Sequence, residues 1–239
     1  DAQALKQAAK LLVQARQPGL LVGWGALDAE AELVQLAELL EAPVCTTLQG
    51  LSVFPGNHPL HTGMGFGKYA VPAAENAFAN CDCLLAIGTR FAEIPTGSYS
   101  MPVPENLIHL DINPAVFDAN YPARLSIEGD ARQLIPALLR EVQALRNTPK
   151  SSGMANKIAC DKAAYRQAWL QHDSKDRVNP AHFCNSLRNQ LHDEAIVVAD
   201  DGNHTFLMAE LMPIHGPRRF ISPSDFNAMG YCVPAVIGA

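Results

Sequence analysis

The sequence predicts an α/β protein with a doubly wound parallel sheet, followed by a second, truncated α/β domain. Short continuous apolar runs alternate with helical patterns along the 239 residues. Such runs are typical of parallel strands that are buried on both faces. Polar or glycine-containing loops follow the runs, and right-handed helical crossovers would bring these loops to one edge of the sheet.

Residues 1–146 carry the predicted sheet, and we interpret them as one complete domain. Apolar residues at helical spacing fill 1–16, and the turn at 17–19 ends that helix. Asp28 and Asp130 each precede a helical pattern and are predicted to cap it. The predicted elements are helices at 1–16, 28–40, 70–80 and 131–145, and strands at 20–22, 43–47, 83–88, 107–112 and 125–128.

The polar segment at 147–156 contains Pro, Ser and Gly and is predicted to be a linker. We interpret residues 157–239 as a second domain. Its predicted elements are helices at 157–172, after 179–180, at 205–212 and at the C-terminal end, and strands at 195–199 and 220–221. Two strands do not make a stable sheet, so we expect this domain to be incomplete and the chain to be part of a longer protein.

Composition excludes several classes of function. Hydrophobic residues make up 48% of the chain and charged residues 18%, and the formal net charge is −6, so nucleic acid is not an expected partner. The sequence contains no apolar run of the roughly 18 residues that a membrane span needs, and no signal peptide. The six cysteines are scattered, which favours reduced thiols and a cytoplasmic location. Cys81-x-Cys83 lacks the second pair that a closed zinc site requires.

The loop after the first predicted strand is a candidate nucleotide site. Gly23-Trp24-Gly25 resembles half of a dinucleotide fingerprint, but the third glycine is replaced by Asp28. A tight turn between strand and helix would also explain both glycines. Arg90 follows another strand end, where it would either hold an anion or pair with Glu93. Both interpretations stay open from the residues alone.

Three histidines lie near predicted strands without metal-like spacing. His58 and His61 belong to the long loop at 49–67, and a loop of this length at a sheet edge is usually functional. His109 alternates with apolar residues in a strand. We therefore interpret His109 as a core histidine with its hydrogen bonds satisfied.

The segment from Asp200 to His204 follows the first strand of the second domain. Asp200 and Asp201 are candidate acid/base or metal-binding carboxylates, or they cap the helix that follows. The free N–H groups at the start of that helix would also make an anion site. Farther along, Met229 is predicted to fill the core at a helix start. We expect these two strand ends to lie side by side and face one ligand.

Two of these segments together resemble the thiamine-diphosphate enzymes of the acetolactate synthase group. Asp200-Asp201-Gly202-Asn203-His204 resembles the family's Asp-x-Gly-x-His segment, and residues 224–239 (SDFNAMGYCVPAVIGA) resemble its Met-Gly and Pro-Ala-x-x-Gly-Ala run. In the first domain the sequences at 61–65, 87–91, 109–114 and 129–130 resemble the family's central domain in the same order. The resemblance implies a Rossmann-like central domain and part of the diphosphate-binding domain.

The resemblance also implies roles for individual residues. Asp201, Gly202, Asn203 and His204 would contact the cofactor's diphosphate. In the segment Asn227-Ala228-Met229, the Asn227 carbonyl would accept from the 4′-amino group of the aminopyrimidine. The Met229 N–H would donate to ring N3′, and its side chain would hold the cofactor bent. The cofactor would then act as the electron sink for decarboxylation of a 2-keto acid.

Several departures from the family pattern change these expectations. The family's Mg²⁺-binding segment and its activating Glu fall outside this sequence, so we expect the isolated fragment to be inactive, with neither a metal ligand nor a catalytic residue. Asp225 and Asn227 replace a small residue and a Gly, which puts acetolactate synthase proper in doubt. Gly23-Trp24-Gly25 and Arg90 resemble flavin-contacting segments, but residues 92–94 depart from the Asp-Asp-Arg of flavin-binding members.

The leading hypothesis is therefore part of a thiamine-diphosphate- and Mg²⁺-dependent 2-keto-acid decarboxylase or carboligase. The family resemblance implies a homodimer or homotetramer and a small 2-keto acid as substrate. One alternative is a non-catalytic or regulatory module whose first domain binds FAD or a similar nucleotide. Another is a folded core left after proteolysis. The sequence does not identify the keto acid or the acceptor.

Overall fold

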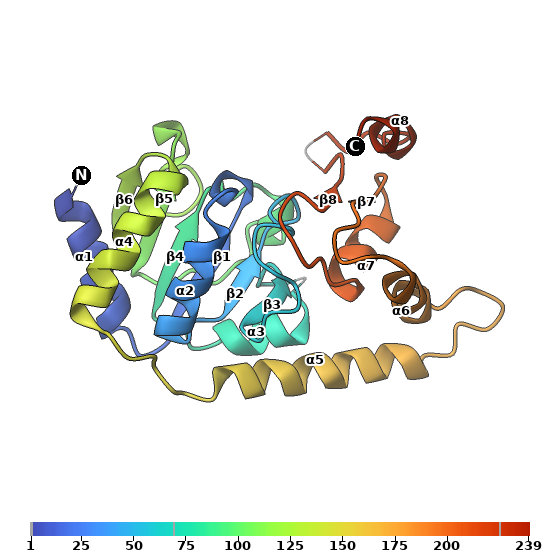
Figure 1. The fold of residues 1–239 in the computed structure, drawn as a ribbon, viewed down its shortest axis with the longest axis horizontal. Coiled ribbons are helices and arrows are strands. Elements are labelled where there is room, and N and C mark those ends of the chain that lie inside the picture. Colours follow the sequence, from blue (N-terminus) through green and yellow to red (C-terminus); the bar gives the residue numbers. More distant parts are fainter. Residues whose placement is uncertain (1, 69, 225) are drawn as a thin grey trace.

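The chain folds around a six-stranded parallel sheet, which confirms the predicted fold class (Figure 1). The computed structural model describes residues 2–68, 70–224 and 226–239. The strands lie in the order β3-β2-β1-β4-β5-β6. They are β1 (Pro18–Val22), β2 (Val44–Thr46), β3 (His61–Met64), β4 (Cys83–Ile87), β5 (Leu107–Asp111) and β6 (Leu125–Glu128).

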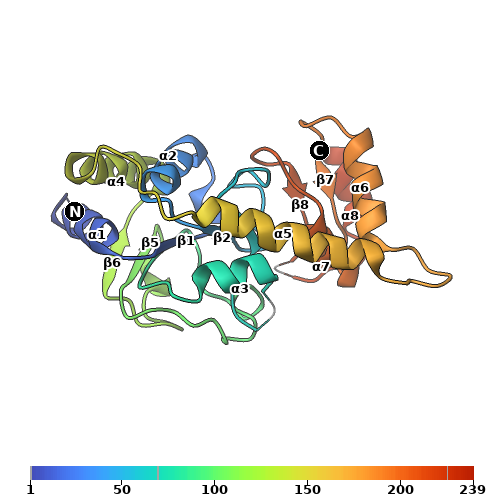
Figure 2. The same ribbon diagram turned by 90° about the horizontal axis from the view of Figure 1, so that it is seen from below.

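Helices cover both faces of this sheet. α1 (Ala2–Gln14), α2 (Glu30–Leu40) and α4 (Ala131–Leu145) form one contiguous layer, and α3 (Pro72–Phe78) lies on the opposite face beside α5 (Figure 2). Every residue of β1 and β4 is buried. The continuous apolar runs in the sequence reflect this burial on both faces.

Two predictions about this part of the chain were wrong. β3 lies inside the predicted loop at 49–67 and pairs in parallel with β2. Its sequence, His61 to Met64, lacks the run of apolar residues that marks the other strands. Asp28 does not cap α2, because Ala29 occupies the cap position. The Asp28 carboxylate instead accepts from Arg218 Nη2 at 3.0 and 3.1 Å, which joins two distant parts of the chain.

α5 (Met154–Gln171) runs beneath the large sheet and continues to the second part of the molecule (Figure 1). It begins inside the segment that we predicted as a linker, because Met154 and Ile158 are buried in the main hydrophobic core. The second part contains α6 (Pro180–Gln190), β7 (Val197–Val198), α7 (Asn203–Leu211), β8 (Phe220–Ile221) and α8 (Cys232–Gly238). The domain boundaries at 146 and 157 stay a prediction.

The two parts share a hydrophobic cluster. Leu48 and Leu51, which follow β2, are buried with Val197 and Phe220 of the small β7-β8 sheet. Close by, the Gly56 N–H donates to the Ile214 carbonyl at 2.7 Å. The carboxyl ends of the large and small sheets are therefore held next to one another, and this contact positions the candidate sites.

The close packing of glycines in the loops after β1 and β4 provides a test of the fold. Gly88 has a φ of +58°, and a Cβ there would lie 2.4 Å from the Gly25 carbonyl carbon. Gly153 is a matched control, because its φ is +78° but nothing lies within 4 Å of a Cβ placed there.

We expect Gly153→Ala to lower the free energy of unfolding by about 1–2 kcal/mol through backbone strain alone. Gly88→Ala should lower it by about 1–3 kcal/mol more, because the methyl group also overpacks the loop after β1. Urea denaturation of both variants measures the difference. Equal losses would contradict the packing seen here.

Candidate functional site

The loops after β1 and β4 meet where the strand order of the large sheet reverses, which is the usual ligand site of an open α/β sheet. Trp24 and Gly25, which follow β1, and Arg90, which follows β4, line a cavity of about 270 Å³ there. Asp111 and Asn113, at the end of β5, complete its wall. The structure thus brings the predicted nucleotide residues together at one edge.

The glycines of this edge also have a packing role. A Cβ on Gly23 would lie 2.3 Å from the Gly88 carbonyl oxygen, and a Cβ on Gly25 would lie 2.8 Å from the Gly88 Cα. The two loops therefore require glycine for their own contact. The glycine pattern alone does not demonstrate a nucleotide site, and the cavity is the independent observation.

Asp200 ties the end of β7 to the segment before α8. Its carboxylate accepts from the Gly230 N–H at 2.8 and 3.0 Å, from the Tyr231 N–H at 3.3 Å and from the Cys232 N–H at 3.4 Å. The hydrogen bond from the Asp201 N–H and those from Cys232 and Gly230 lower the pKa of Asp200 to about 2. Asp200 therefore stays ionised and holds the two predicted cofactor segments together.

This arrangement leaves the start of α7 without a side-chain cap. Gly202 occupies the cap position with a φ of 150°, and no side chain accepts a hydrogen bond there. Of the two interpretations of the acidic pair at 200–201, a cap on α7 does not form, because the Asp200 carboxylate accepts from the Gly230, Tyr231 and Cys232 amides instead. Asn203 and His204 are exposed residues of the first turn, where helix N–H groups have no acceptor within the helix.

The segment at 226–229 projects from the protein. Met229 is 84% exposed and Phe226 is 91% exposed. The prediction that Met229 fills the core at a helix start was wrong, since α8 begins only at Cys232. Asn227 has a φ of +51°. Apart from glycine, Asn is one of the residues that adopt a positive φ most readily. Asp225, the other departure noted in the sequence, lies outside the described residues.

A cavity of about 590 Å³ joins the two parts of the molecule at their carboxyl edges. Trp24 and Gln49 line it from the large sheet, and Phe226, Ala228 and Tyr231 line it from the small one. The contribution of Gln49 was missed, because its position depends on a loop contact between distant segments.

His204 lines a different cavity of about 400 Å³, with Asp200 and Cys232. The two predicted halves of the cofactor site therefore touch through Asp200 but line separate cavities. The expectation of one shared ligand stays a prediction.

The cysteines and histidines provide no metal site among residues 2–68, 70–224 and 226–239, where no group of three His, Cys, Asp or Glu is placed to hold an ion. Cys81 and Cys83 are free thiols. His109 is fully buried, as expected of a core histidine, and its Nε2 lies 2.8 Å from the Thr89 carbonyl oxygen. Its Nδ1 has no partner within the described chain, so only one of the two ring nitrogens has the hydrogen bond that we expected.

None of the helices in the described ranges is long and apolar enough to cross a membrane.

A doubly wound parallel sheet with a cavity at the point where its strand order reverses is typical of ligand-binding α/β domains. Residues 5–138 match the family described as thiamine pyrophosphate enzyme, central domain, and the chain belongs to this family. Its relatives place it in the acetolactate synthase group.

Three relatives with different names illustrate the proteins to which this chain is similar. Acetolactate synthase large subunit of Corynebacterium glutamicum is 33% identical over 100% of this chain and 38% of its own length. Sulfoacetaldehyde acetyltransferase of Rhodobacter capsulatus is 33% identical over 100% of this chain and 44% of its own. The protein named probable 2-ketoarginine decarboxylase of Pseudomonas aeruginosa is 31% identical over 99% and 41%. The chain spans about two fifths of the length of these relatives.

The role of Asp200 can be tested by hydrogen exchange. We expect Asp200→Ala to speed exchange of the Gly230, Tyr231 and Cys232 amides, because their common acceptor is removed. Asp201→Ala is the matched control, since no hydrogen bond of the Asp201 side chain occurs in the described structure. Similar exchange rates in the two variants would argue against a structural role for the hydrogen bonds from these amides to Asp200.

The hydrogen bonds from these three amides to the Asp200 carboxylate should also depend on pH. The pKa of Asp200 is lowered from 3.8 to about 2, so its contribution is present above pH 3.8 and is lost as the pH falls toward 2. Amide exchange of Gly230, corrected for intrinsic rates, should therefore accelerate in acid in the wild-type protein. The Asp200→Ala variant should not show this acid-dependent step.

Proposed function

We propose that this chain supplies the central domain and part of the diphosphate-binding domain of a thiamine-diphosphate-dependent 2-keto-acid decarboxylase or carboligase. The observation that carries the proposal is the open N-terminus of α7, which Asp200 holds beside the segment at 227–230. The names of the relatives, which include a synthase, an acetyltransferase and a decarboxylase, support the reaction class.

The start of α7 fits the diphosphate of the cofactor. The first N–H groups of a helix and its dipole favour an anion. A Cβ on Gly202 would lie 2.9 Å from the His204 ring, so glycine lets the backbone pass close to that side chain. We assign diphosphate contacts to Gly202, Asn203 and His204, with the backbone of Asp201 beside them.

The segment before α8 fits the aminopyrimidine. In the proposed complex the Asn227 carbonyl accepts from the 4′-amino group, and the Met229 N–H donates to the ring. The exposed Met229 side chain would then be covered by the cofactor, which gives a reason for so large an apolar group at the surface. Ala228 lines the adjoining cavity and leaves room there. When bound, thiamine diphosphate supplies the electron sink for loss of CO₂ from a 2-keto acid.

The remaining parts of the proposed enzyme come from outside the described residues. We assign neither the ligands of Mg²⁺ nor the activating carboxylate to this chain. An assembly of two or four copies and a cytoplasmic location are part of the same proposal, and the keto acid is not specified. The departures at Asp225 and Asn227, of which Asp225 would bring an acidic side chain near the ring, would favour a substrate preference different from that of acetolactate synthase itself.

Met229 provides the sharpest test of the cofactor site. We expect Met229→Ala to weaken binding of thiamine diphosphate and Mg²⁺ by roughly tenfold or more, because an apolar contact is lost. Thermal stability without cofactor should stay unchanged, since the side chain is 84% exposed. Isothermal titration calorimetry on the protein at its full natural length measures the affinity.

Val178→Ala is a matched control, because Val178 is 76% exposed and lies away from the site. It should bind the cofactor like the wild type. CO₂ release from a panel of 2-keto acids should require thiamine diphosphate and decrease in Met229→Ala. Cofactor-independent release, or none from any keto acid, would refute the proposed function.

A second candidate function is nucleotide binding at the edge formed by β1 and β4. The cavity of about 270 Å³ at the switch point favours it, since Trp24, Gly25 and Arg90 line its wall. FAD is one such nucleotide, and ADP is another with the same diphosphate chemistry. In this function Gly23-Trp24-Gly25 would lie against the nucleotide, and Arg90 would neutralise its charge.

Tryptophan fluorescence distinguishes this candidate. Trp24 is 48% exposed at the cavity, so addition of FAD or ADP should change its emission. Trp24→Phe should abolish the change, and Trp169→Phe should retain it. A change that persists in Trp24→Phe would place the nucleotide elsewhere.

A further inference from the structure

A fourth cavity, of about 190 Å³, lies at the junction of the two parts of the molecule and shares no lining residue with the three cavities described above. We call it the junction cavity. It is lined by β3, by α3, by the middle of α5, and by the C-terminal end of α7 with the loop after it, and it is partly open to solvent. Most of its wall is apolar, including Val71, Leu211 and Ile214. The volume is many times the roughly 10–15 Å³ that one water requires.

His61 is an unusual component of this wall. It is only 5% exposed, and neither ring nitrogen forms a hydrogen bond of normal geometry within the described residues, although the Gly56 backbone lies close enough to the ring to raise its pKa slightly. Phe54 stacks on the ring at 6.2 Å between centroids, which fixes its orientation. Burial and the nearby charge of Lys162 lower the pKa of His61 to about 3, so the ring is neutral. A buried polar group without a partner is costly, and it indicates an occupant that supplies one.

Lys162 brings a positive charge to the same cavity. It lies on α5 and forms no ion pair with any residue that the structure describes. Desolvation lowers the pKa of Lys162 to about 8. Arg166, one turn farther along α5, also lines the cavity. An anion between these groups would offset the cost of holding the ammonium group away from water.

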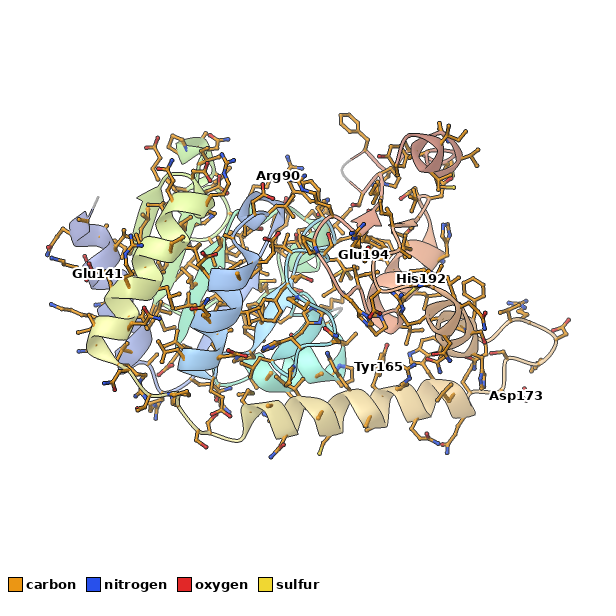
Figure 3. All side chains as sticks on the ribbon, in the orientation of Figure 1. Arg90, Glu141, Tyr165, Asp173, His192 and Glu194 are labelled. Atoms are coloured by element: carbon orange, nitrogen blue, oxygen red, sulfur yellow. The ribbon has the colours of Figure 1, made fainter. Side chains whose placement is uncertain are left out.

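The one carboxylate in the wall is already engaged. Glu210 on α7 accepts from the Tyr165 hydroxyl at 2.8 Å, and burial raises its pKa. Tyr165 lies on the side of α5 that faces α7 (Figure 3). Outside the wall, His58 contacts Glu38 at 3.2 Å. The described groups around Lys162 therefore leave its positive charge without an ion pair beside a neutral imidazole, in a mainly apolar wall.

We propose that the junction cavity binds a short aliphatic monocarboxylate. Lys162 and Arg166 would attract the carboxylate, and an N–H of His61 would donate to it. The apolar wall from Val71 to Ile214 would surround the aliphatic body. Because the site contacts β3, α5 and α7 at once, its occupant would stabilise the junction between the large and small sheets. The proposal is independent of the cofactor and of the proposed reaction.

Thermal unfolding in isobutyrate tests this site. Isobutyrate is an aliphatic monocarboxylate without a keto group, so it reports on the cavity rather than on turnover. At constant ionic strength set with chloride, isobutyrate should raise the melting temperature of the wild-type protein. Lys162→Met should weaken isobutyrate binding by about tenfold or more, since a hydrogen bond to a charged group is lost.

Lys157→Met is the matched control, because Lys157 is on the same helix and its Nζ donates to the Asn76 carbonyl outside the cavity. It should respond to isobutyrate like the wild type. Lys162→Gln provides a second variant if the Met substitution perturbs folding. No stabilisation of the wild type, which would mean that water alone fills the cavity, overturns the proposal, as does equal stabilisation of all variants.

The pH dependence of binding provides a further check. Lys162 is protonated below about pH 8, so isobutyrate affinity should fall as the pH rises through this value. His61 stays neutral, because its pKa is about 3, and the pKa of Tyr165 is raised to about 12. An affinity that does not change between pH 7 and pH 9, on either side of the pKa of about 8, would remove Lys162 from the site.

Discussion

The carboxylate of Asp200 is the interaction on which the candidate cofactor site depends. It is the only described side chain that accepts from the three successive amides of Gly230, Tyr231 and Cys232. By capping α8 it leaves α7 uncapped, and its own backbone carbonyl accepts from the Thr205 hydroxyl at the start of α7. One residue thus joins the end of β7 to the start of α8 and also contacts the start of α7. In the proposed function, this geometry would hold the segments assigned to the diphosphate and to the ring next to one another.

The packing between the two parts of the chain determines where these loops lie. Leu48 and Leu51 leave the large sheet and enter the hydrophobic cluster of the small one. The ion pair between Asp28 and Arg218 spans the same junction, although both side chains are largely exposed and such pairs contribute little stability. Buried apolar contact is therefore the main force that places Trp24 and Gln49 beside Ala228. The same junction encloses the cavity at His61 and Lys162.

The sequence predicted the features that local pattern determines. Continuous apolar runs predicted β1, β4 and β5 because both faces of these strands are buried. β3 was missed because pairing with β2, rather than its own composition, makes a strand of residues that include His61 and Gly63. The capping role of Asp200 was missed because its partners lie far along the chain and sequence spacing gives no sign of them. The interpretation of Met229 as a core residue was wrong because an apolar residue type alone does not determine burial, and its cofactor contact stays a prediction.

Nuclear magnetic resonance of the Asn203 and His204 amides tests the central claim most directly. With Mg²⁺ present, thiamine diphosphate should shift both amide signals, because its diphosphate accepts from these N–H groups at the start of α7. Thiamine without phosphates should leave both signals in place. If thiamine diphosphate binds to the protein at its full natural length and neither amide responds, the diphosphate lies elsewhere and the start of α7 is not its binding site.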